Sequence, residues 1–101
     1  MDDEALRRFG YSENLAWSKL AEGAAGEARG LFLDCLGLAD GDLGTRVGDV
    51  YVGLGQCLLE EGNSPDALRY FALSLATGPS AHLRPIARRY LAELDARKYS
   101  R

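Results

Sequence analysis

The residues best suited to chemistry in this chain are one histidine and two cysteines, and their spacing favours neither catalysis nor metal binding. His82 stands beside a predicted turn, with no Cys or Ser at a spacing typical of a nucleophile–base pair. Cys35 and Cys57 lie in separate amphipathic segments, whereas zinc sites use ligands in short paired spacings. We therefore expect no enzymatic activity, no cofactor and no metal, with His82 at the surface and both thiols buried and free.

Two short motifs hint at ligand loops but lack the residues that would complete them. The segment 40–42 (Asp-Gly-Asp) begins like a calcium loop, but Gly44 and Tyr51 stand where later oxygen donors are required. The segment 53–55 (Gly-Leu-Gly) has no third glycine after it and no strand before it, which excludes a dinucleotide-binding turn.

The composition describes one small domain with an uneven charge. The chain has 101 residues, 47% of them hydrophobic, and a net charge of −3. Residues 1–60 carry −6, whereas residues 61–101 carry +3 from a late cluster of bases. The net acidity of the chain argues against nucleic acid as a partner despite that cluster. The N-terminus is acidic where a secretory signal is basic, and no stretch approaches the ~20 apolar residues of a membrane span, so we expect a cytoplasmic protein with no membrane partner.

The elements that would position these residues are all predicted to be helices. Apolar residues recur at three- and four-residue spacings over five segments separated by glycine- or proline-containing turns. At the fourth segment Ser64 fits the N-cap, Pro65 the first helical position and Asp66 the first turn. The sequence therefore predicts an all-α chain with helices over 12–22, 25–37, 46–61, 64–76 and 83–97.

The chain also aligns with itself at an offset of 39 residues, which predicts repeated supersecondary units. The matched positions share residue type: Leu15 with Leu54, Leu20 with Leu59, Glu22 with Glu61, Gly23 with Gly62, Ala28 with Ala67, Phe32 with Phe71, and Leu36 with Leu75.

These residues resemble the tetratricopeptide repeat (TPR) family. The strongest copy has large, small, glycine, aromatic and proline anchors at the spacing of that family: Leu54, Gly55, Leu58, Gly62, Ala67, Phe71, Ser74 and Pro79. The upstream copy departs from the pattern at Lys19 and Asp40, and 86–90 resembles the start of a third repeat. The resemblance implies a single domain over 1–101, formed by repeat 1 (about 9–38), a loop (37–46), repeat 2 (about 47–79) and a capping helix (about 83–97). Such repeats stack as a short right-handed α-solenoid.

In that family the first helix of each repeat lines a concave groove that holds a peptide or a partner helix. Transferred to this chain, the groove-lining positions are Glu13, Trp17, Leu20, Ala21, Asp49, Val52, Gln56, Leu59, Glu60, Arg84, Arg88 and Leu91. Trp17, Gln56 and Arg88 are expected to form a row across it, although Trp17 packing against the N-terminal segment and a solvated Arg88 are equally open.

The resemblance implies a protein-interaction module, here for a partner of basic or mixed charge. A subset of the family captures a C-terminal carboxylate through Lys and Asn, but the corresponding positions hold Glu13, Trp17, Val52 and Gln56, so that clamp is absent. The alternative is a homodimer formed through terminal helix faces, because short stacks leave their ends uncovered. In that alternative the far side of the fifth helix, around Leu83, Ile86, Tyr90 and Leu94, contacts a second copy.

Overall fold

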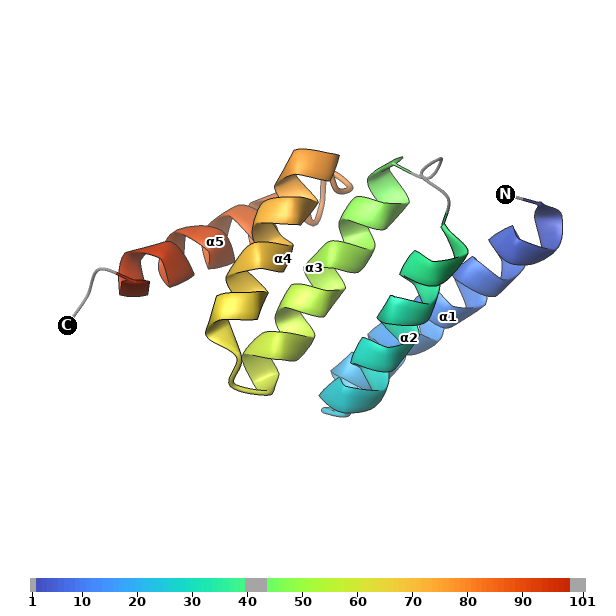
Figure 1. Cartoon of the computed structure of the whole chain (residues 1–101), viewed down its shortest axis with the longest axis horizontal. Helices are drawn as coiled ribbons and strands as arrows, with labels where there is room; N and C mark the ends of the chain where they lie inside the picture. Colours follow the sequence, from blue (N-terminus) through green and yellow to red (C-terminus); the bar gives the residue numbers. More distant parts are fainter. Residues whose placement is uncertain (1, 40–43, 99–101) are drawn as a thin grey trace.

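The computed structural model describes residues 2–39 and 44–98, and within these ranges the chain is all-helical, as predicted. Five helices follow one another, each packing beside its neighbours (Figure 1). They are α1 (Asp3–Ala21), α2 (Ala25–Leu38), α3 (Gly44–Glu60), α4 (Ser64–Thr77) and α5 (Arg84–Lys98).

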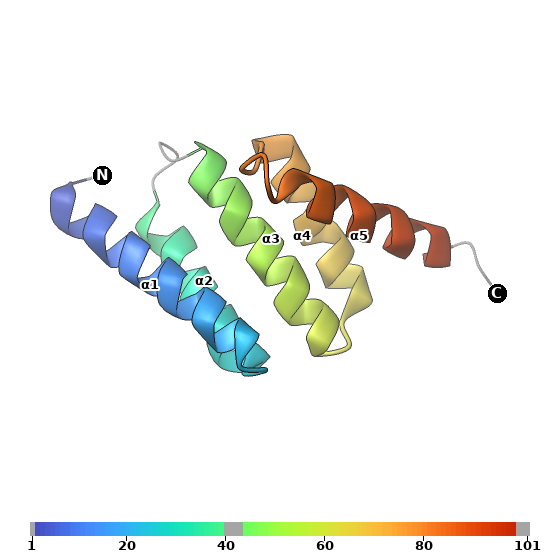
Figure 2. The same cartoon turned by 180° about the vertical axis from the view of Figure 1, so that it is seen from behind.

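The helices form two antiparallel hairpins followed by a single helix. Gly23 joins α1 to α2 and Gly62 joins α3 to α4, with φ of 85° and 80°. Glycine occupies these turns because it adopts a left-handed conformation without a Cβ clash. Seen from behind, α1, α3 and α5 lie on one face of the molecule, with α2 and α4 on the other (Figure 2). The molecule is elongated, with extents of 49 × 26 × 21 Å.

The core is divided into two clusters along this length. The first is centred on Phe32, between α1, α2 and α3, and the second on Phe71, between α3, α4 and α5. Both rings are fully buried. Two glycines of α3 make room for them: a Cβ at Gly53 would lie 2.3 Å from the Phe32 ring, and one at Gly55 would lie 2.7 Å from the Phe71 ring. The Gly-Leu-Gly motif is thus explained by helix packing.

A polar latch joins the α4–α5 connection to α3. Asp49 accepts hydrogen bonds from the Ser80 backbone N–H at 2.7 Å and from the Ser80 hydroxyl at 2.5 Å. One helical position earlier, a Cβ at Gly48 would come within 2.9 Å of the Pro79 nitrogen, so only glycine permits this close approach. The latch holds the α4–α5 connection against α3.

Several predicted boundaries need correction. α1 begins at Asp3 rather than near residue 12, because Asp2 caps it by accepting from the Ala5 N–H. The N-cap of α4 is Asn63, which accepts from the Asp66 N–H, so Ser64 is the first helical residue. The loop predicted over 37–46 is too long, because α2 continues to Leu38 and α3 starts at Gly44. Residues 40–42, the calcium-like motif, lie outside the described residues.

Candidate protein-binding groove

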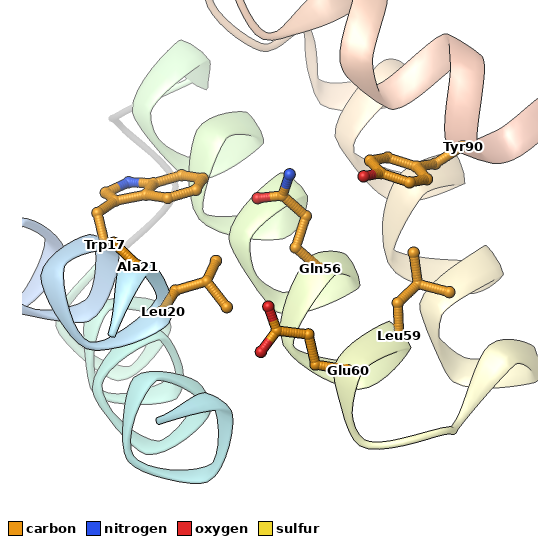
Figure 3. A pocket seen from close by; sticks show the side chains of 7 residues that line it. All are labelled: Trp17, Leu20, Ala21, Gln56, Leu59, Glu60 and Tyr90. Atoms are coloured by element: carbon orange, nitrogen blue, oxygen red, sulfur yellow. The ribbon is translucent and has the colours of Figure 1, made fainter. Parts of the chain in front are cut away.

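The face formed by α1, α3 and α5 carries a pocket of about 270 Å³. Figure 3 shows its lining, which comes from the last two turns of α1, the last two turns of α3 and the middle of α5: Trp17, Leu20, Ala21, Gln56, Leu59, Glu60 and Tyr90. Six of these belong to the groove predicted from the sequence. The structure therefore brings Trp17, Leu20, Gln56 and Glu60 together in one depression.

Aromatic side chains form two sides of the pocket, and each is supported by a ring of the core. Trp17 meets Phe32 edge to face, with ring centroids 5.0 Å apart and planes at 79°. Tyr90 stacks on Phe71 at 5.1 Å and 18°. Such contacts restrict the rotamers of both half-buried side chains. The walls are thus held in place before any partner arrives.

Polar groups from α3 and α5 point into the space between these walls (Figure 3). The Gln56 amide and the Tyr90 hydroxyl face each other across it, and the Glu60 carboxylate points toward α1. In the described part of the chain the side chains of Trp17, Gln56, Glu60 and Tyr90 make no hydrogen bond or ion pair. These donors and acceptors remain available to an external group.

Two residues of α3 that were expected in the groove do not line the pocket. Val52 is fully buried in the second core cluster, and Asp49 is buried with both oxygens bound by Ser80. Their predicted roles in the groove are wrong, because the α3 face around them is covered by α5 and its connection. Glu13 is also occupied: its side chain is only 14% exposed and pairs with Arg46 Nη2 at 3.4 Å, away from the pocket.

The α5 side of the groove differs from the predicted one. Arg84 and Arg88 are exposed and do not line the pocket, and Arg84 Nη2 lies 3.5 Å from the Pro79 carbonyl oxygen as a donor. Tyr90 lines the pocket where Arg88 was expected. The prediction that Tyr90 lies on the far side of the fifth helix is therefore wrong. The sequence holds no strong signal for this, since Pro85 leaves the register of α5 open.

Comparisons with known proteins do not identify this groove. No family model, curated protein or solved structure matches the chain. Among residues 2–39 and 44–98, no helix is long and apolar enough to span a bilayer. The same residues contain no group of three or more His, Cys, Asp or Glu side chains placed to hold a metal ion.

The cysteines are buried and free, as predicted. Desolvation raises the pKa of Cys35 to about 12, and the nearby charge of Glu13 adds to this. Desolvation likewise raises the pKa of Cys57 to about 11, with Glu61 as the next cause. Thiols held protonated in this way are poor nucleophiles and poor metal ligands at neutral pH. His82 is exposed, as predicted.

Proposed function

We propose that this chain is a small protein-interaction module that holds a segment of a partner protein between α1, α3 and α5. The pocket walled by Trp17 and Tyr90 carries the proposal, because its polar groups point inward and have no partner in the described part of the chain. Buried aromatic side chains flanked by a few oriented polar groups are typical of binding hot spots.

We further propose that the helices form a short right-handed stack of TPR-like repeats capped by α5. Equivalent positions of the two hairpins support this reading. Phe32 and Phe71, which match at the 39-residue offset, are both fully buried. The matching small residues Ala28 and Ala67 are also fully buried, as close helix packing requires. A chain of this kind binds through its surface and carries out no chemistry.

The pocket is of a size that can hold one side chain of a peptide. Its volume of about 270 Å³ falls just below the range of roughly 300–1,000 Å³ that is usual for sites enclosing a drug-sized ligand. The lining also holds no nucleophile beside a base. We therefore propose a protein or peptide partner, with affinity spread along the groove on either side of the pocket.

Selection from a displayed library of random peptides tests this function. Ala21 and Ala76 are both exposed in the last turn of a helix, but only Ala21 lines the pocket. Arginine is a good helix former at either position, so Ala21→Arg and Ala76→Arg form a matched pair. We expect peptides that bind the wild type and Ala76→Arg but not Ala21→Arg. If every enriched peptide binds both variants equally, the groove is not the binding site.

Self-association remains the alternative, but its expected surface changes. On α5, Leu94 is buried, Tyr90 is stacked and Ile86 packs against the second core cluster, as does Leu83 just before the helix. Large exposed apolar side chains lie instead on other helices, of which Tyr11 of α1 is the most exposed at 71%. A homodimer would therefore form through α1. Light scattering that gives a monomer mass at micromolar concentration would reject this alternative.

A further inference from the structure

We propose, building on the proposed function, that the bound segment places an arginine side chain in this pocket, between the Trp17 ring and the Glu60 carboxylate. The partner is thus a peptide with a basic residue next to an apolar one. Three features of the described residues support this occupant: an unneutralised carboxylate, two helix ends of the same sign and an aromatic wall.

The carboxylate of Glu60 stands apart from its acidic neighbours because they already have cationic partners. Arg29 donates to both oxygens of Glu61, at 2.7 and 3.1 Å. Lys19 lies 3.2 Å from Glu27 and 3.9 Å from Glu22. Glu60 has no ion pair within residues 2–39 and 44–98, and it is the only acidic residue in the pocket lining.

The backbone adds negative potential at the same place. α1 and α3 run in the same direction and end side by side (Figure 2), and the pocket is lined by their final turns. The C-terminus of each helix is equivalent to roughly −0.5 of an elementary charge. α3 has no basic residue in its last turn, and the Lys19 of α1 is held by its two glutamates. Two helix dipoles and Glu60 therefore favour a cation.

The walls suit arginine better than lysine. A guanidinium group can stack on the Trp17 ring while donating two hydrogen bonds to the Glu60 carboxylate. Leu20 and Leu59 line the same pocket and offer apolar surface to its aliphatic stem. The groove residues that would have made this surface more broadly acidic, Glu13 and Asp49, are committed to Arg46 and Ser80. The preference is thus local to one pocket.

Titration with N-acetyl-argininamide tests the pocket directly. Trp17 is the single tryptophan, so its indole N–H gives one assigned NMR signal. We expect a saturable shift of this signal with the arginine probe and none with the uncharged analogue N-acetyl-citrullinamide. Glu60→Gln should weaken the arginine response roughly fivefold, the size of a partly exposed ion pair. Asp34→Asn, which removes an exposed charge on α2, should leave it unchanged. Equal responses to both probes, no response to either, or an unaltered response in Glu60→Gln would overturn the proposal.

The peptide selection separates this proposal from the proposed function. The first outcome is a set of arginine-rich peptides that do not bind Ala21→Arg and bind Glu60→Gln more weakly. This outcome supports both the interaction module and the arginine pocket. Groove-dependent peptides without a basic residue overturn the arginine pocket and leave the interaction module standing. Absence of groove-dependent peptides overturns both.

Discussion

Replacing Gly53 by alanine tests the contact that joins the two hairpins. The added Cβ would lie 2.3, 2.6 and 2.7 Å from three atoms of the Phe32 ring. That ring is fully buried and meets Trp17 on another side, so it has little room to move. The substitution therefore forces α2 and α3 apart or distorts both aromatic side chains.

The expected cost follows from two opposing terms. Overpacking a core costs roughly 1–3 kcal/mol, and because three atoms clash at once we expect the overpacking cost of Gly53→Ala to be about 3 kcal/mol. Alanine in a helix interior regains about 1 kcal/mol over glycine. We expect a net loss of about 2 kcal/mol, which lowers the melting temperature by roughly 8–16 °C in a domain of this size.

Gly30→Ala supplies the matched control. Gly30 lies inside α2, and nothing lies within 4 Å of an added Cβ. The substitution to alanine should therefore stabilise the protein by roughly 0.5–1 kcal/mol. Thermal and urea unfolding followed by circular dichroism measure both variants, and Trp17 fluorescence reports whether the Phe32 ring has moved. If Gly53→Ala were as stable as Gly30→Ala, Phe32 would not lie against α3 and the packing described above would be wrong.

Three further predictions concern the α4 cap, the α3 latch and the thiols. Asn63→Ala should cost about 1 kcal/mol of stability, and Ser64→Ala much less, because only Asn63 caps α4. Asp49→Ala should cost about 2 kcal/mol of stability, since the Ser80 N–H and hydroxyl lose the carboxylate that accepts their hydrogen bonds. Both cysteines have pKa values raised from 9.0 to about 12 and 11 in the folded chain. As the pH rises, the thiols lose their protons in the unfolded chain before they do so in the folded chain. The free energy of unfolding is therefore unaffected by the thiols below pH 9 and declines as the pH rises from 9 toward the folded pKa values.

Each of these outcomes has a clear contrary result. Equal losses for Asn63→Ala and Ser64→Ala in urea unfolding would return the cap to Ser64. An Asp49→Ala variant with wild-type stability would remove the latch. For the thiols, rapid reaction of the native protein with a disulfide reagent at neutral pH would contradict their burial, and replacing both by alanine should flatten the decline of stability above pH 9.

The five helices could be predicted because apolar periodicity and turn residues both mark them. Gly23 and Gly62 end the first and third helices at the places expected from their sequence context. The start of α1 is difficult to infer because most residues that follow Asp2 are polar, and Phe9 is the first buried residue of the helix. Boundaries set by one capping side chain are difficult to infer when two candidates are adjacent, as Asn63 and Ser64 show.

The groove could be predicted only in part. Residues in the last turns of α1 and α3 share one pocket because they follow the helical repeat. Val52 and Asp49 lie on the same face of α3 as Gln56, but both are buried. The position of α5 and of the connection that precedes it decides this burial. The same packing brings Tyr90 into the pocket. Such contacts are between distant segments and leave no local pattern in the sequence.

The position of α5 at the end of the row has a consequence for the dynamics of the groove. α5 packs mainly on α4 and diverges from it toward the C-terminus (Figure 1), so it has fewer neighbouring helices than α1 or α3. Local opening of α5 would carry Tyr90 away from Phe71 and remove one wall while the first hairpin stays folded. A ligand that contacts Tyr90 should therefore slow amide hydrogen exchange in α5 more than in α1 or α2. The packed terminal helix and the complete pocket are therefore one and the same state, and a ligand that contacts Tyr90 would stabilise both.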